Sequence, residues 1–463
     1  MDIIITSSEA EGIGKTGGLG DYATGLSESL SKIDEVNIKL IMPKYKKIKD
    51  IDLKLITKCT IPHSDDFEDY LFEFDVFYTK LNNVDVYLIS NEYYFNRENI
   101  YTYDDEYLRW SFFSRAIMEL ITFMDWNPNI IHTNDSMEGI LPLMYKKLNK
   151  NSPKFVLVIH SIYYQTQYDI DNKDLFNAYL GLKWDDNQIS FMEQAIIYSD
   201  KVLTVGKSNA KDIQTTEKGW GFDKLLKSKH VEGILNGINK ELYPRNYPFK
   251  SFLSIKKDYK NNIQKKFNLE VNNDIPLFVY VGRLYHQKGT DLFLDIMDNM
   301  MSEGFQFILL GTGTEDYEKL FIDLSKKYPN FILCNEFNEE LSIELYKGGD
   351  ILLMPSKCEP NGLSQIIAMN YATIPIVHNT GGLKDTIIDC FKNSEHGNGF
   401  KFYDFNSNEF YDTILNAVDI FKNKKEFWIK IMENDYKEDY GWDNQVKIYL
   451  KYYKSLLEWK NGY

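Results

Sequence analysis

Short apolar segments alternate with longer stretches of helical periodicity along most of the chain. Buried strands are expected at Ile3–Thr6, Ile38–Met42, Val84–Ile89, Asn129–His132, Phe155–Ile159, Lys201–Val205 and Val231–Leu235, with helices between them, for example at Tyr107–Met124 and Met137–Leu148. The pattern stops in the polar, Lys- and Asn-rich stretch 236–274. It resumes with expected strands at Leu277–Val281, Gln306–Leu310, Phe331–Cys334, Asp350–Met354 and Thr373–Val377, and the last stretch, 409–463, is helical in pattern. Such alternation predicts parallel sheets covered by helices on both faces.

The two series of strands predict an α/β protein of two doubly wound domains. A chain of 463 residues is long enough for two domains of roughly 200 residues each. We expect the first domain at 1–243, the second at 244–440 and a C-terminal helix at 441–463. In such domains ligands bind at the carboxyl ends of the strands.

Charge and composition exclude several classes of partner. The chain has 53 Lys and Arg against 68 Asp and Glu, a net charge of −15, which argues against a broad nucleic-acid surface. No apolar stretch approaches membrane-spanning length, and the N-terminal residues lack the basic region of a signal peptide. The four cysteines are sparse and have no metal-type spacing. We therefore expect a cytoplasmic protein with no nucleic-acid or membrane partner.

A glycine-rich loop follows the first expected strand. Residues 11–21 read E-G-I-G-K-T-G-G-L-G-D, with five glycines, one lysine and one aspartate. The dinucleotide-binding and P-loop patterns both match only in part: residues 7–11 separate the loop from the strand, and Glu9 stands where a P-loop needs its first glycine. A flexible loop without function is the alternative. The composition suits a backbone that approaches a phosphate ester.

The segment K-T-G-G-L-G-D at Lys15–Asp21 resembles the N-terminal signature of bacterial glycogen synthases and plant starch synthases. Further segments resemble that family in the same order, among them I-H-T-N-D at 131–135, G-I-L-N-G-I at 233–238, R-L-Y-H-Q-K-G at 283–289, E-P-N-G-L-S-Q at 359–365 and T-G-G-L-K-D-T at 380–386. The resemblance implies a GT-B fold: two Rossmann-like domains that face each other across a cleft, and a C-terminal helix that returns to the first domain. It also implies an acceptor-side N-terminal domain and a nucleotide-sugar-binding C-terminal domain.

By the same resemblance, the expected reaction transfers glucose from ADP-glucose to the non-reducing end of an α-1,4-glucan, with retention of the anomeric configuration. The expected partners are the nucleotide sugar and the glucan, and we expect neither a cofactor nor a metal. Without a metal, cations must meet the diphosphate, and Arg283 and Lys288 are close enough in sequence to reach one anion. A solvated basic loop is the alternative for this pair.

Other candidate residues lie after strands, where the functional edge is expected. Glu359 is expected beneath the sugar, where it balances positive charge, or it is only a first-turn acid of the helix expected near Gly362. His160 is expected against the transferred glucose, although a lone histidine is more often structural. Asp135 and Asn236 are expected to hydrogen-bond sugar hydroxyls. The other expected substrate-binding residues are Lys15, Gly17, Gly18, Asp21, Gly362, Leu363, Ser364, Gly381 and Gly382.

Phe337 occupies the aromatic position of the family segment that stacks on adenine, here Glu336-Phe337-Asn338-Glu339. Stacking predicts a preference for ADP-glucose over UDP-glucose, because a purine offers the ring more surface. The alternative is that Phe337 only packs the next helix onto the sheet.

The chain departs from the family pattern at several positions beside the candidate residues. Family residues are replaced at Ser136, Met137, Ser161, Glu193–Ala195, Gly206–Lys207 and Asn361, and Cys358 precedes Glu359. These departures affect expectations about substrate preference more than those about reaction type. The alternatives are a related enzyme of the sucrose or trehalose type that uses UDP-glucose or a small acceptor, a non-catalytic glucan-binding relative and, more distantly, a dehydrogenase.

Overall fold

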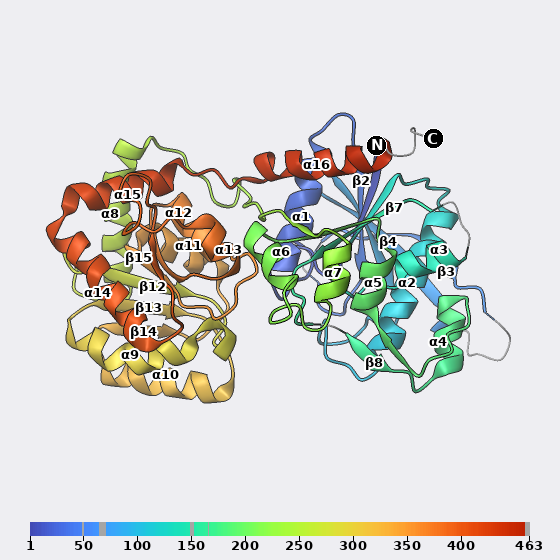
Figure 1. Ribbon diagram of the computed structural model, residues 1–463, viewed down its shortest axis with the longest axis horizontal. Helices are drawn as coiled ribbons and strands as arrows, with labels where there is room; N and C mark the ends of the chain where they lie inside the picture. Colours follow the sequence, from blue (N-terminus) through green and yellow to red (C-terminus); the bar gives the residue numbers. More distant parts are fainter. Residues whose placement is uncertain (49–50, 64–70, 149–151, 165, 459–463) are drawn as a thin grey trace. The chain divides into compact units, whose positions relative to one another are not determined.

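The computed structural model describes residues 1–48, 51–63, 71–148, 152–164 and 166–458 (Figure 1). The chain forms two compact units. The N-terminal unit consists of two segments, one that ends at Gly237 and one that begins at Trp442. The C-terminal unit is Ile238–Gly441. The expected domain limits at 243 and 440 lie near these two crossings.

The N-terminal unit is built on a nine-stranded sheet with the order β11-β10-β7-β6-β1-β2-β5-β4-β3. Its strands are β1 (Asp2–Thr6), β2 (Asn37–Pro43), β3 (Lys54–Thr60), β4 (Glu73–Leu81), β5 (Val84–Ser90), β6 (Ile130–Asn134), β7 (Lys154–Ile159), β10 (Lys201–Thr204) and β11 (Glu232–Gly233). All seven strands expected from the sequence are present. The sheet is parallel, as predicted, except at one edge, where β4 pairs antiparallel with both β3 and β5.

Helices and one small sheet complete the N-terminal unit. The helices are α1 (Gly18–Ser31), α2 (Glu106–Phe123), α3 (Leu141–Lys147), α4 (Lys173–Leu180), α5 (Phe191–Tyr198), α6 (Lys207–Ile213), α7 (Asp223–Ser228) and α16 (Trp442–Glu458), and β8 (Gln167–Asp169) pairs antiparallel with β9 (Gln188–Ser190). The expected return of the C-terminal helix is confirmed, because α16 lies beside α1 (Figure 1). Trp442, Tyr449 and Tyr453 of α16 are buried in the core of this unit.

The C-terminal unit contains a six-stranded parallel sheet with the order β14-β13-β12-β15-β16-β17. The strands are β12 (Leu277–Val281), β13 (Gln306–Leu310), β14 (Phe331–Cys334), β15 (Ile351–Met354), β16 (Ile374–His378) and β17 (Phe400–Phe402). Its helices are α8 (Phe249–Lys266), the 3₁₀ helix η2 (His286–Lys288), α9 (Thr290–Ser302), α10 (Glu315–Lys327), α11 (Glu339–Gly348), α12 (Ser364–Asn370), α13 (Gly381–Thr386), α14 (Ser407–Asn423) and α15 (Lys425–Lys437). Strand β12 lies directly beside β15, so the loops that follow them leave the same edge of the sheet.

The polar stretch 236–274, where the strand–helix pattern stops, contains the 18-residue helix α8. Its buried face carries Lys256 and Lys260, each at most 5% exposed, in place of apolar residues. The Lys256 ammonium donates to the backbone oxygen of Tyr371 at 2.9 Å, and the Lys260 ammonium donates to that of Ile275 at 2.7 Å. Because lysines occupy buried positions of α8, its apolar residues do not recur with the helical period, and the hydrophobic pattern does not predict the helix.

In the described residues we find no helix that combines the length and the apolar character needed to cross a membrane.

Candidate active site

The glycine-rich loop of the N-terminal unit is held by a buried carboxylate. Glu9, 3% exposed, accepts hydrogen bonds from the backbone N–H of Thr16 at 2.5 Å and from that of Gly17 at 2.9 Å. The Tyr101 hydroxyl donates to the same carboxylate at 2.7 Å. Gly17 caps α1 and Gly18 is its first residue. Glu9 therefore supplies the negative charge at this helix start and fixes the shape of the loop.

Lys15 lies between two acidic side chains of the same loop. Its ammonium pairs with Glu11 and lies 3.0 Å from Asp21 Oδ1. Burial alone would lower the pKa of Lys15, but the charges of Asp21 and Glu11 outweigh burial and raise it above its usual range. Lys15 therefore stays positively charged, and the structure brings it together with Asp21, a contact that the sequence did not predict.

Asp135 and His160 meet at the carboxyl ends of the neighbouring strands β6 and β7. Asp135 Oδ1 accepts the backbone N–H of His160 at 2.7 Å and that of Ser161 at 3.2 Å. Burial raises the pKa of Asp135 to about 7, although these two hydrogen bonds act in the opposite direction. Asp135 has a left-handed backbone with φ of 52°, which an aspartate tolerates better than most residues.

The ring of His160 is fixed by Asn134. Asn134 donates from Nδ2 to the Thr6 carbonyl at 2.9 Å, so its oxygen faces His160 Nε2 at 3.0 Å. Burial lowers the pKa of His160 to about 3, so the imidazole is neutral at physiological pH. Because an amide oxygen can only accept, Nε2 carries the proton and Nδ1 carries a lone pair.

Two other buried groups lie close in sequence to Asp135. His132 contacts the hydroxyls of Tyr22 at 3.1 Å and Tyr453 at 2.7 Å, so this motif residue links β6 to α1 and α16. Glu138 is fully buried, and burial raises its pKa to about 8. The I-H-T-N-D segment thus serves the fold through His132 and presents Asp135 beside His160.

In the C-terminal unit, Lys288 and Glu359 form an ion pair. Lys288 Nζ lies 2.5 Å from Glu359 Oε2, and the Ser356 hydroxyl donates to the same oxygen at 3.2 Å. The Glu359 side chain is 9% exposed and that of Lys288 is 24% exposed. The pair joins the loop after β12 to the loop after β15.

Gly381 and Gly382 allow the start of α13 to lie against the Glu359 loop. The Gly382 N–H donates to the Glu359 carbonyl at 2.9 Å. A Cβ on Gly381 would lie 2.0 Å from that carbonyl oxygen, and one on Gly382 would lie 2.1 Å from the Asn361 carbonyl oxygen. Any larger residue would push the Glu359 loop away, so these glycines position the carboxylate.

Arg283 lies at the same strand edge but does not join the ion pair. Among the residues that the structure describes, its guanidinium has no hydrogen-bond or ion-pair partner, and it lies over the Tyr285 ring at 5.6 Å. The residue is exposed, while its carbonyl accepts the Tyr280 hydroxyl at 2.8 Å. The backbone is thus fixed and the cation is accessible to an anion.

Phe337 follows β14, two strands away from β12 in the sheet. Its side chain is 77% exposed, so the alternative that it packs the following helix onto the sheet was wrong. Asn338, the next residue, caps α11 by accepting the Leu341 N–H at 2.9 Å. The ring therefore projects from a fixed helix start at the carboxyl edge of the sheet.

The remaining candidates lie at the start of α12 and at the last residues before the chain enters the C-terminal unit. Gly362 has a φ of 73° and precedes Leu363, the partly buried cap of α12. The Ser364 hydroxyl contacts the Val281 carbonyl at 3.3 Å and accepts from Tyr346 at 2.9 Å. Asn236 is 5% exposed and lies just before the crossing into the C-terminal unit.

Several departures from the family pattern have local roles. Asn361 Nδ2 donates to the Gly362 carbonyl at 2.8 Å, within the loop that holds Glu359. The Glu193 N–H donates to Ser190 at 3.2 Å, so Glu193 lies in the capped first turn of α5. Ser161 donates its N–H to Asp135. Met137 packs against the core of the N-terminal unit, and its sulfur accepts the Ser136 hydroxyl at 3.7 Å.

Sequence reasoning missed Glu9 and Asn134 as functional residues. In the sequence, Glu9 only stands where a P-loop would need a glycine, and Asn134 is only part of the I-H-T-N-D segment. A carboxylate two residues before a glycine-rich loop is a usable signal, because the loop's free N–H groups need an acceptor. The tautomer of His160 follows only from the amide orientation of Asn134, which no sequence pattern gives.

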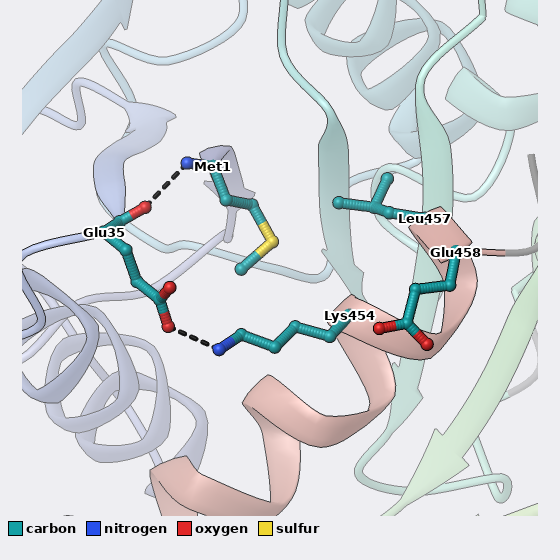
Figure 2. Close-up of a pocket in the computed structure, with 5 residues that line it drawn as sticks. All are labelled: Met1, Glu35, Lys454, Leu457 and Glu458. Atoms are coloured by element: carbon teal, nitrogen blue, oxygen red, sulfur yellow. Dashed lines mark hydrogen bonds and ion pairs between the residues drawn. The ribbon is translucent and has the colours of Figure 1, made fainter. Parts of the chain in front are cut away.

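A pocket of about 290 Å³ lies elsewhere in the N-terminal unit, lined by Met1, Glu35, Lys454, Leu457 and Glu458 (Figure 2). The Met1 amino group donates to the Glu35 carbonyl at 2.6 Å, and Lys454 pairs with the Glu35 carboxylate. None of the candidate site residues lines it. The Lys454–Glu35 pair attaches α16 to the segment between α1 and β2, away from the candidate residues.

Comparison with known proteins covers both units. The family described as "Starch synthase catalytic domain" matches residues 2–228, and "Glycosyl transferases group 1" matches residues 261–429. A glycogen synthase of Clostridium kluyveri is 37% identical over 99% of this chain and 100% of its own length. The chain belongs to the glycogen synthase family. Another glycogen synthase of this family, from Fusobacterium nucleatum, is 36% identical over 99% of this chain and 100% of its own length.

Solved structures agree with this membership. The catalytic domain of starch synthase IV from Arabidopsis thaliana, bound to ADP and acarbose, is 25% identical with a TM-score of 0.88 and covers 98% of both chains. A sucrose-phosphate synthase from Thermosynechococcus elongatus is 16% identical with a TM-score of 0.64 over 99% of both chains, which shows a shared fold only. This glycogen synthase family member has the GT-B fold and is a glycosyltransferase, as its motifs indicated. The individual roles of the candidate residues stay predictions.

Proposed function

We propose that the chain is a retaining glucosyltransferase that transfers glucose from ADP-glucose to the non-reducing end of an α-1,4-glucan, in the cytoplasm and without a cofactor or a metal. The observation that carries this proposal is the Lys288–Glu359 ion pair, 2.5 Å between Nζ and Oε2, at the strand edge that also presents Arg283. A nucleoside diphosphate sugar carries two negative charges on its diphosphate next to the sugar. This strand edge has cations that can bind the diphosphate and a carboxylate that can lie beside the sugar.

The nucleotide-sugar donor is assigned to residues of the C-terminal unit. Arg283 is accessible and meets the diphosphate, while Lys288 is held by Glu359 close to it. Phe337 lies two strands from β12, roughly 10 Å along the sheet, which suits the distance between the phosphates and the base of ADP. The exposed ring stacks on adenine.

The reaction needs charge stabilisation at two atoms. The bond between the anomeric carbon and the diphosphate oxygen breaks, and ADP leaves with the bonding electrons. The acceptor hydroxyl oxygen bonds to the anomeric carbon on the same face and gives its proton to the departing phosphate oxygen. Glu359 stabilises positive charge at the anomeric carbon, and Arg283 and Lys288 stabilise negative charge on ADP.

The N-terminal unit contributes neutral hydrogen-bonding groups. The lone pair on His160 Nδ1 accepts a hydrogen bond from a sugar hydroxyl, because Nε2–H is already donated to Asn134. Asp135 and Asn236 bind further hydroxyls, and Lys15 with Gly17, Gly18 and Asp21 contacts the donor and acceptor side.

The test supplies glycogen with ADP-glucose labelled in the glucose. After transfer, the polymer is digested with β-amylase, which removes maltose from non-reducing α-1,4 ends. We expect early release of the label as maltose. Label that resists β-amylase, or label found only in a small acceptor, would contradict the proposed acceptor end or linkage.

A further inference from the structure

Three exposed aromatic side chains form a group on the N-terminal unit, in which Tyr163 contacts both Tyr164 and Trp220. Tyr163, Tyr164 and Trp220 are 56%, 54% and 54% exposed. The ring centroids of Tyr163 and Trp220 are 4.8 Å apart at 87°, and those of Tyr163 and Tyr164 are 5.4 Å apart at 84°. Edge-to-face contacts of this kind leave more than half of each side chain in contact with solvent. We call these three residues the aromatic cluster.

The aromatic cluster is attached to the candidate site through the chain itself. His160 directly follows β7, which ends at Ile159, and Tyr163 lies in the same loop. Ile162, between them, is 6% exposed and packs in a small apolar core with residues such as Met192 and Val202. This anchor fixes where the loop leaves His160 and where it presents Tyr163.

Trp220 comes from a separate segment between α6 and α7 (Figure 1). Backbone hydrogen bonds on both sides hold the segment: the Gly219 N–H donates to the Thr215 carbonyl at 2.8 Å, and the Phe222 N–H donates to the Gly219 carbonyl at 2.9 Å. The indole is therefore presented by an ordered turn against Tyr163.

We infer that the aromatic cluster is a stacking surface for glucose units of the α-glucan acceptor; this inference rests on the proposed function. A glucose ring has apolar C–H faces and hydroxyls around its rim. Aromatic rings cover the apolar face, while the rim hydroxyls stay in water or bond to tyrosine hydroxyls. Because His160 is assigned to the transferred glucose, a cluster in the same loop is placed to hold acceptor units next to it.

A glucan fits this surface better than a protein partner does. The cluster contains two tyrosines and one tryptophan, which combine an apolar ring with a polar group. The acceptor is also a substrate that the proposed reaction already requires. A protein that docked here would compete with it.

The experiment measures glucan binding without any donor. Maltoheptaose is titrated calorimetrically into the full chain and into the variants Trp220→Ala and Tyr163→Ala. Phe123→Ala is the matched control, because Phe123 is an aromatic residue of the same unit that is 60% exposed. We expect affinity to fall by about tenfold in each cluster variant, to stay unchanged in the control and to be largely kept in Trp220→Phe.

Kinetics supply the second readout. With ADP-glucose and glycogen, the KM for glycogen should rise about as much as the affinity falls, and the KM for ADP-glucose should not change. Unchanged maltoheptaose affinity in both cluster variants, no binding by the wild type, or an equal rise in the KM for ADP-glucose would each overturn the inference. Wild-type protein that binds maltoheptaose through the cluster but transfers no glucose would instead contradict the proposed function.

Discussion

Lys288 and Glu359 lie 71 positions apart in the sequence, yet their side chains form a direct ion pair of 2.5 Å. The contact depends on the adjacency of β12 and β15 and on Gly289, whose Cβ would lie 2.0 Å from the Pro355 carbonyl oxygen. One substitution in this pair therefore changes the electrostatics of both loops.

Glu359→Gln should lower kcat by 100-fold or more, about 3 kcal/mol of transition-state stabilisation, because the amide keeps the shape and loses the charge. The thermal midpoint should fall only modestly, since Lys288 keeps a polar neighbour. Glu303→Gln, at an exposed position of the same unit, is the control and should keep wild-type kcat. A folded Glu359→Gln protein with near-normal kcat would show that the carboxylate has another role.

Arg283→Ala should lower kcat/KM for the donor by about 100-fold, because one charge-assisted contact to the diphosphate is lost. Stability should not change, since the guanidinium is exposed and has no ion-pair partner among the described residues. Lys326→Ala, which removes an exposed cation of the same unit, should leave the rate as it is.

Addition of EDTA to the wild type should leave the initial rate of transfer unchanged, because Arg283 and Lys288 neutralise the charge of the diphosphate in place of a divalent metal ion. The measurement is the rate before and after dialysis against the chelator. Loss of the rate, followed by recovery with a divalent ion, would contradict this part of the proposed function.

Phe337→Ala should raise the KM for ADP-glucose more than the KM for UDP-glucose, because stacking on a purine is worth roughly 1–3 kcal/mol. The folded state should tolerate the change, since the side chain is 77% exposed. Phe391→Ala, at another exposed aromatic of the unit, is the control. An equal rise in the KM for both donors would mean that Phe337 does not distinguish adenine from uracil.

Glu138→Gln should stabilise the N-terminal unit, and the gain should grow as pH rises from about 5 to 8. Burial raises the pKa of Glu138 from 4.5 to about 8, so over this range the folded protein keeps a proton that the unfolded chain releases. Wild-type stability therefore falls with pH through this group, whereas glutamine has no proton to lose. At pH 8 the difference in unfolding free energy should be about 2–4 kcal/mol. Urea unfolding at several pH values measures it, and a difference that does not vary with pH would contradict the burial argument.

Much of the fold could be read from the sequence because the core strands are apolar runs. Ile3, Ile4 and Ile5 of β1 are at most 2% exposed, and such runs are visible without a structure. The antiparallel strands β3 and β4 were not visible, since their side chains are largely half-exposed and mixed in polarity. Helix α8 was hidden by Lys256 and Lys260, whose hydrogen bonds to loop carbonyls substitute for apolar contacts.

The candidate site was predictable only as a set of motif residues. The sequence indicated Glu359 and Lys288 separately, but their contact depends on strand order and on glycines whose neighbours are distant in sequence. The same holds for Glu9, which acts through the Thr16 and Gly17 N–H groups. Only the carboxylate of such a contact can be recognised in the sequence, because the N–H groups that it binds belong to the backbone.

The most direct test of the proposed glucosyltransferase activity compares transfer from labelled ADP-glucose and from labelled UDP-glucose to glycogen. The label is counted in the precipitated polymer. We expect the wild type to incorporate labelled glucose efficiently from ADP-glucose and more weakly from UDP-glucose. We expect almost no incorporation by the Glu359→Gln variant. No incorporation from either donor by folded wild-type protein, or a clear preference for UDP-glucose, would contradict this proposal.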